Sequence, residues 1–191
     1  MEKQKAFLNH VEHAHREQKR KYTNEPYINH LTTVASLSIH YSTTMGYDYK
    51  HVYEIAIGHD LMEDTYLNDS KTLKTILISC GYAHEEAMDI INGIINLTDK
   101  YTKQHYPDLN REERKILEAY RLSKIPKREK LIKLSDIFDN SSSILQYDPN
   151  FSKVYIPEKK NILNLFKEEC EYWPIYQKCS SLITITNFKN E

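Results

Sequence analysis

Apolar side chains recur at helical spacing through almost the whole sequence, and this pattern restricts the possible folds more than any other feature. In the segment that starts near Tyr27, Leu31, Val34 and Ala35 stand three and four residues apart, which places them on one face of an α-helix. Only 4 glycines and 6 prolines interrupt the 191 residues, so the connections between helices should be short. The sequence predicts an all-α fold with sheet nearly absent.

The length of the chain suits one folded domain. With 191 residues, of which 40% are hydrophobic, it can bury a single core. It contains no internal repeat, low-complexity tract or Gly/Ser linker. We predict one domain over residues 1–191, in which residues 150–191 supply a closing helix at about 158–177 and a tail. Residues 181–188 of that tail could form a short strand or a frayed end.

Charge and targeting signals favour a cytoplasmic protein that binds a small molecule. The 26 basic side chains nearly balance the 27 acidic ones, so the global field does not favour nucleic acid or an anionic membrane as a partner. No apolar run approaches the roughly 20 residues of a membrane span, and the N-terminus is charged, unlike a secretory signal. Cys80, Cys170 and Cys179 lack metal-knuckle spacing and should be reduced core thiols.

Turn and cap residues divide the chain into helical segments. A charged amphipathic helix is expected over residues 3–21, followed by a turn at 23–26 that contains a proline. Asp69 and Ser70 can cap a helix that contains Leu73 and Leu77, and Gly81 stands where a left-handed residue often ends a helix. A polar loop over 98–109 separates two further helices, and Pro126 should precede a helix that carries Asp136.

One segment directs a histidine toward the interior. Within a helix predicted over residues 48–62, His59 continues the apolar face of Val52, Ile55 and Ala56 at positions i, i+3, i+4 and i+7, so it should point inward. Asp60 cannot share that face, but at a helix end it can turn back toward a metal ion that the histidine binds. Singly, such a histidine is more often a packed residue than a ligand.

Five short motifs in a fixed order make the metal interpretation specific. They are AHREQKRK at 14–21, PYINHL at 26–31, HDLMEDT at 59–65, NLTDK at 96–100 and KLSDIFDN at 133–140. On these motifs, residues 6–147 resemble the HD superfamily of metal-dependent phosphohydrolases. Within it they are most similar to the hydrolase domains of RelA/SpoT-type enzymes and to small stand-alone alarmone hydrolases related to the metazoan SpoT homologue. The resemblance implies an HD-domain helical bundle.

The resemblance also implies a metal centre with catalytic carboxylates beside it. It assigns one divalent ion, usually manganese in this branch, to four ligands: His30, His59, Asp60 and Asp136. Mixed imidazole and carboxylate ligation suits manganese without excluding other divalent ions. Glu63 and Asp64 follow by one helical turn, close enough to orient or deprotonate an attacking water. The resemblance gives this pair the catalytic role.

Four further residues are candidates for substrate contact: Arg20, Lys21, Tyr27 and Asn140. Arg20 matches a family arginine, and a guanidinium can hold phosphate through two parallel hydrogen bonds. Tyr27 lies beside His30 in the sequence, and Asn140 shares a helical face with Asp136. His15 stands in the first motif and His13 directly before it. Both lie outside the metal set, with packing or support of the ligands as their expected role.

The leading hypothesis is hydrolysis of the 3′ diphosphate of guanosine tetra- or pentaphosphate, (p)ppGpp, the alarmone of the stringent response, with release of pyrophosphate. Two alternatives stay open: an HD phosphohydrolase for another phosphorylated nucleotide or NADPH, and a nucleotide-binding sensor without catalysis. Departures from the family pattern, such as Leu31 and Ser135, leave the nucleotide undecided. A binuclear cyclic-nucleotide phosphodiesterase would need extra histidines, for which only His84 and His105 are available.

Overall fold

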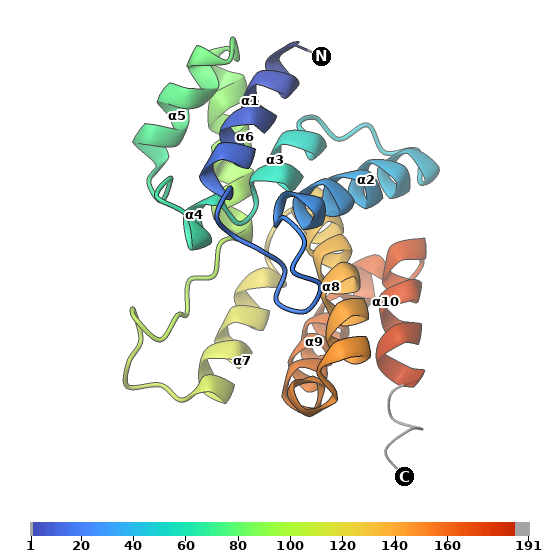
Figure 1. Ribbon diagram of the computed structural model, residues 1–191. Coiled ribbons are helices and arrows are strands. Elements are labelled where there is room, and N and C mark those ends of the chain that lie inside the picture. The colour runs from blue at the N-terminus through green and yellow to red at the C-terminus, as the bar shows by residue number, and fades with distance from the viewer. Residues whose placement is uncertain (1, 186–191) are drawn as a thin grey trace. The chain divides into compact units, whose positions relative to one another are not determined.

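Helices make up the protein in the computed structural model, which describes residues 2–185 (Figure 1). Over that range it contains ten helices and no strand, and the backbone pairing of Lys19 with Pro26 is an isolated bridge. The prediction of an all-α fold is therefore confirmed. The chain divides at Thr98 into two compact units. A single domain over residues 1–191 stays a prediction.

The first unit consists of six helices arranged around α3. Their bounds are α1 Glu2–Ala14, α2 Ile28–Thr44, α3 Val52–Gly58, α4 Leu61–Asp64, α5 Ser70–Ser79 and α6 His84–Leu97. Helix α3 contacts α1, α2 and α6, while α5 packs on α6 and α1 (Figure 1). The expected caps are present: Asp69 accepts hydrogen bonds from the amides of Lys71 and Thr72, and Gly81 has a φ of +93°.

Helix α3 is short but buried on nearly every side. Ile55, Ala56 and Ile57 are fully buried, as expected for a helix with neighbours all around it. Glu54 is also buried, and its carboxylate accepts hydrogen bonds from Gln4 and from Tyr82. The helix predicted over 48–62 in fact ends at Gly58, and the chain turns at His59 and Asp60 before α4 begins. That turn allows adjacent residues to approach one point.

Helix α1 ends earlier than the sequence pattern predicts. The amphipathic pattern extends to residue 21, but the helix stops at Ala14 and residues 15–27 form turns. The Arg20 amide donates to the Glu25 carbonyl, and Asn24 between them adopts a left-handed φ of +58°. These contacts satisfy the backbone groups that a longer helix would have paired. The result is a folded connection between α1 and α2.

The described part of the second unit consists of four helices. They are α7 Arg111–Leu122, α8 Lys127–Tyr147, α9 Pro149–Cys170 and α10 Pro174–Ile185. Helix α9 packs against α7, α8 and α10. The single closing helix predicted at 158–177 is wrong, because a turn at 171–173 separates α9 from α10 and Pro174 opens the second helix, a position where its missing N–H costs nothing.

The described part of the tail is helical. Residues 181–185 belong to α10, so a strand does not begin there, while 186–188 lie outside the described residues. The three cysteines form no disulfide; Cys170 and Cys179 are buried and Cys80 is half-buried. Over the described range, no helix combines the length and apolar character needed to cross a membrane.

Two glycines allow α3 and α6 to approach closely. A Cβ on Gly58 would lie 2.7 Å from Ile94 Cδ1, and one on Gly93 would lie 2.8 Å from Ile55 Cγ1. Ile55 and Ile94 are fully buried, so neither side chain can move aside without disturbing the core. This contact fixes the end of α3, from which His59 and Asp60 follow.

We predict that Gly93→Ala destabilises the protein. Alanine favours the helix by about 1 kcal/mol, but crowding a packed core costs about 1–3 kcal/mol, and Ile55 offers no free space. Urea unfolding followed by circular dichroism should therefore show a lower free energy of unfolding. Asn92→Ala, at the exposed neighbouring position, is the control and should be neutral or slightly stabilising. An equally stable Gly93→Ala protein would contradict the close approach of the two helices.

Candidate metal centre

Three potential metal-binding side chains converge in the first unit. One ligand atom from each of His30, His59 and Asp60 can be chosen so that all lie within 4.8 Å of one another. Asp60 Oδ2 is 3.2 Å from His59 Nε2 and 3.7 Å from His30 Nε2. Two imidazole nitrogens and a carboxylate oxygen are a donor set that fits a divalent transition metal.

The orientation of His59 suits it for metal binding. The side chain is only 3% exposed, which confirms that it points inward. Its Nδ1 lies 2.7 Å from the Ala56 carbonyl oxygen. Because a carbonyl oxygen only accepts, Nδ1 must carry the proton, and the neutral ring then presents the lone pair of Nε2. A backbone carbonyl that holds the second nitrogen in this way is typical of histidine ligands.

His30 and Asp60 are brought to the same point by different elements. His30 lies in the first turn of α2 and is 2% exposed, on the same buried face as Leu31 and Val34. Asp60 lies between α3 and α4, and its Oδ2 accepts a hydrogen bond of 2.6 Å from the Tyr27 hydroxyl. The tyrosine ring also contacts the His30 ring, with centroids 5.3 Å apart. Tyr27, predicted to touch substrate, is thus bonded to a candidate ligand.

Glu63 and Asp64 occupy α4, directly after the candidate ligands. Both are exposed, and Asp64 Oδ2 accepts a hydrogen bond of 2.9 Å from Gln18. Partial loss of solvent raises the pKa of Asp64, and the negative charge of Asp60 raises it further, against the opposite effects of Gln18, His15 and His59. A carboxylate with a raised pKa is a better proton acceptor than an ordinary one. Their catalytic role stays a prediction.

Asp136 and Asn140 belong to α8 in the second unit. Asp136 is 7% exposed; its Oδ2 accepts from Lys133 Nζ at 2.9 Å and its Oδ1 accepts from Asn140 Nδ2 at 2.6 Å. Both partners lie one helical turn away and therefore on the same face. Asp136 as the fourth ligand, and Asn140 as a substrate contact, stay predictions. The structure adds that Asn140 orients Asp136.

Arg20 and Lys21 lie in the connection between α1 and α2. The Arg20 backbone is fixed at both ends, since its amide bonds to Glu25 and its carbonyl accepts from the Asn24 amide. The Lys21 ammonium lies 4.9 Å from the centre of the Tyr22 ring. This connection also supplies Gln18 and Tyr27 to the candidate centre. Substrate contact by Arg20 and Lys21 stays a prediction.

Gln18 and Lys133 lie within the motifs, but their contacts with acidic residues were not predicted from the sequence. Gln18 reaches Asp64 across 46 positions of sequence, and only its place in AHREQKRK connects it with the other motifs. Lys133 stands three residues before Asp136, a spacing that places two residues on the same helical face. The second contact could have been found from the sequence, whereas the first depends on how the connection folds.

A cluster of charged side chains that includes Lys133 occupies the second unit. Lys115 Nζ lies 2.6 Å from Asp99 Oδ2. Burial opposes ionisation of Asp99, but Lys133 and Lys115 outweigh it and hold its pKa below the usual range. In Lys159, whose ammonium lies 4.6 Å from the centre of the Tyr155 ring, the charged form is disfavoured instead. Burial, with Lys133 and Lys115 nearby, lowers the pKa of Lys159 to about 8.

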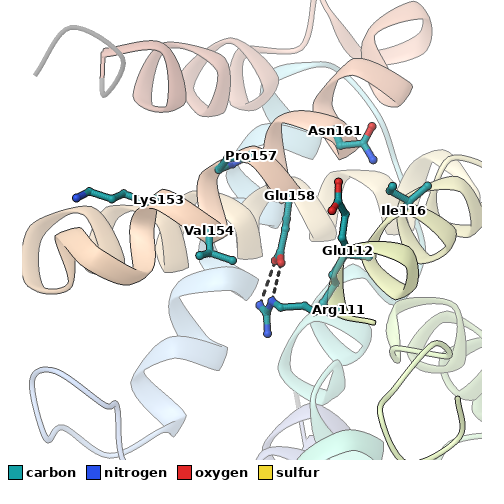
Figure 2. Close-up of a pocket in the computed structure, with 9 residues that line it drawn as sticks. Arg111, Glu112, Ile116, Lys153, Val154, Pro157, Glu158 and Asn161 are labelled. Carbon is teal, nitrogen blue, oxygen red and sulfur yellow. Dashed lines mark hydrogen bonds and ion pairs between the residues drawn. The ribbon is translucent and has the colours of Figure 1, made fainter. Parts of the chain in front are cut away.

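An open pocket lies next to this cluster, between α7 and α9. Its volume is about 610 Å³, and Figure 2 shows Arg111 directed at Glu158 along its wall. Arg111 holds that carboxylate through two hydrogen bonds of 2.7 and 3.2 Å. Ile116, Val154 and Pro157 supply apolar lining. None of the predicted ligand, catalytic or substrate residues lines this pocket.

The comparison with solved structures agrees with the resemblance drawn from the motifs. No model of a known protein family matches the sequence, and no curated protein matches it either. One similar solved structure is described as a metazoan orthologue of SpoT that hydrolyses ppGpp and plays a role in starvation responses. It shares 22% sequence identity with a TM-score of 0.76, over 97% of this chain and 96% of that chain. The chain therefore has the same fold as that SpoT orthologue.

We predict that divalent metal binding depends on His59. Loss of a residue that only supports a ligand weakens metal binding by about 10- to 100-fold. Removing a direct ligand should therefore weaken manganese binding by about 100-fold or more. Titration calorimetry on His59→Ala, compared with the native protein, measures this. His10→Ala, which removes an exposed imidazole, is the control and should bind as the native protein does. Equal affinity in His59→Ala would remove His59 from the centre.

We also predict that Lys159 makes stability depend on alkaline pH. Its pKa is about 8 in the folded protein against an ordinary 10.5, so between these values the unfolded chain binds more protons. Stability due to this residue therefore rises with pH across that window and is lowest below it. Lys159→Met should stabilise the protein below pH 8, and the gain should shrink toward pH 10.5.

The comparison requires unfolding curves at several pH values for both proteins. Lys160→Met removes an exposed lysine from the next position and should show no such pH-dependent gain. A gain for Lys159→Met that stayed constant over the window would contradict the lowered pKa.

Proposed function

We propose that this protein is a metal-dependent phosphohydrolase that removes the 3′ diphosphate of (p)ppGpp as pyrophosphate. The observation that carries the proposal is the convergence of His30, His59 and Asp60, with the His59 ring held by the Ala56 carbonyl. The order of the motifs and the similar structure described as hydrolysing ppGpp support the choice of substrate.

The proposed ligands are the three converging residues of the first unit together with Asp136. Their nitrogens and carboxylates fit manganese, the ion that the family resemblance favours. When bound, such an ion lowers the pKa of a coordinated water and stabilises charge on a phosphate oxygen. The Asp136 carboxylate has a fixed orientation, because Lys133 and Asn140 each donate a hydrogen bond to one of its oxygens.

Glu63 and Asp64 are proposed to handle the protons of the reaction. Water adds to the phosphorus attached to the 3′ oxygen, and the bond between that phosphorus and the 3′ oxygen breaks. One proton of the water must be taken up, and the leaving 3′ oxygen must receive one to become a hydroxyl. The carboxylate of Asp64 has a raised pKa and a fixed hydrogen bond from Gln18, which suits it to accept that proton. Glu63, one residue earlier on α4, is the second carboxylate within the same turn.

Recognition of the substrate is proposed to involve Arg20, Lys21, Tyr27 and Asn140. The two cations would meet the negative charge of the phosphates, and the guanidinium of Arg20 can bind two phosphate oxygens at once. Tyr27 is held against His15 and His30 through its ring, so a bound nucleotide would meet a rigid surface there. The protein would act on a small-molecule nucleotide in the cytoplasm.

The test is release of pyrophosphate from ppGpp and pppGpp in manganese, with NADPH and ordinary nucleotides in parallel. We expect release from the two alarmones, loss of that release with a chelator, and a kcat lower by about 100-fold or more in Glu63→Gln and Asp64→Asn, as for loss of a general base. Glu85→Gln, an exposed carboxylate of the same unit, should keep its kcat.

Other outcomes would change the assignment in defined ways. Turnover of a different phosphorylated nucleotide or NADPH alone would keep the metal chemistry and reject the alarmone. Tight binding of ppGpp without turnover in manganese would indicate a sensor and reject the hydrolase.

A further inference from the structure

His15 is buried at the end of α1, although it lies outside the set of proposed ligands. It is 2% exposed, and its amide bonds to the Val11 carbonyl, so its backbone continues the last turn of the helix. Burying an imidazole is costly unless its polar atoms are used. His15 makes two contacts, one with Gln18 and one with Tyr27, and each of these partners bonds to a different acidic residue of the candidate centre.

The first connection runs through Gln18 to Asp64. Gln18 Nε2 donates to Asp64 Oδ2 at 2.9 Å, because a carboxylate can only accept. The amide oxygen of Gln18 must then face the other way, where His15 Nδ1 lies 2.6 Å from it and donates. The directions of both hydrogen bonds are therefore determined, and a flipped Gln18 amide would break both.

The second connection runs through Tyr27 to Asp60. The His15 and Tyr27 rings are stacked, with centroids 5.2 Å apart and an interplanar angle of 26°. The hydroxyl at the far end of Tyr27 donates to Asp60 Oδ2 at 2.6 Å. Stacking restricts the tilt of the tyrosine ring, and so it restricts where that hydroxyl can lie.

We propose that His15 is a positioning residue that holds Asp64 through Gln18 and Asp60 through Tyr27. The inference rests on the proposed metal-dependent hydrolysis, in which Asp60 is a ligand and Asp64 accepts a proton. The proposal gives the folded connection between α1 and α2 a function, because His15, Gln18 and Tyr27 all belong to that connection. The two connections serve different steps, and therefore they can be separated by experiment.

Single substitutions that remove only polar atoms separate the two connections. Tyr27→Phe keeps the stacked ring and loses the hydroxyl, so manganese should bind about tenfold more weakly, as when an outer contact of a ligand is lost. Gln18→Met keeps the length of the side chain and loses the amide. Its manganese affinity should stay within about twofold, and its kcat should fall at least about tenfold with KM unchanged.

Two substitutions of His15 test its central place. His15→Phe retains a ring to stack on Tyr27 but has no donor for Gln18, so it should behave as Gln18→Met, and combining the two changes should add little. His15→Asn retains a donor near the position of Nδ1 but cannot stack. It should restore most of the kcat that His15→Phe loses and bind manganese more weakly, as Tyr27→Phe does.

The controls are Tyr66→Phe and Gln104→Met, which make the same chemical changes at exposed positions. Both should match the native protein in manganese affinity, measured by electron paramagnetic resonance of the free ion, and in kcat. Native affinity and kcat in both Tyr27→Phe and Gln18→Met would overturn the proposal and leave His15 as a packing residue.

Failure of the proposed function would be recognised separately. If the native protein turned over no alarmone, the manganese affinities of Tyr27→Phe and His15→Asn would still decide the connection to Asp60. Weaker binding in both would support that connection, and native binding in both would overturn it.

Discussion

The close packing of α3 against α6 is the constraint on which the first unit depends. Gly58 and Gly93 leave no room for a side chain between the two helices, and the isoleucines that they face are fully buried. Helix α3 is therefore held on several sides and cannot shift along its axis without loss of core contacts. His59 and Asp60 directly follow the end of this fixed helix. A purely apolar contact therefore determines the position of the backbone that holds two of the candidate ligands.

Directional hydrogen bonds then orient three of the candidate side chains. A backbone carbonyl orients His59, the Tyr27 hydroxyl orients Asp60, and the Gln18 amide orients Asp64. The same arrangement recurs in the second unit, where both oxygens of Asp136 accept hydrogen bonds from residues of its own helix. A ligand side chain that is held by a second contact loses less freedom when it binds an ion.

Different parts of the fold were predictable to different degrees. The periodicity of residues such as Ile55 and His59 reports burial directly, and it correctly placed this histidine inside. The same reasoning failed after Ala14, because an amphipathic pattern continues to residue 21 although the backbone there forms other hydrogen bonds. It also missed the break before Pro174, since apolar residues on either side of a short turn can keep the helical spacing.

The sequence by itself determined the helical fold class, the inward direction of His59 and the motifs that indicate an HD phosphohydrolase. These follow from local spacing and from residue type, which every short window of the chain contains. The resemblance also predicted that His30 and Asp60 meet His59. Only the tertiary structure decided that Tyr27 donates to Asp60, that Gln18 reaches Asp64, and that His15 stacks on Tyr27. Such contacts join residues from different elements, and their geometry depends on how helices and a folded connection pack, which periodicity along the chain does not encode.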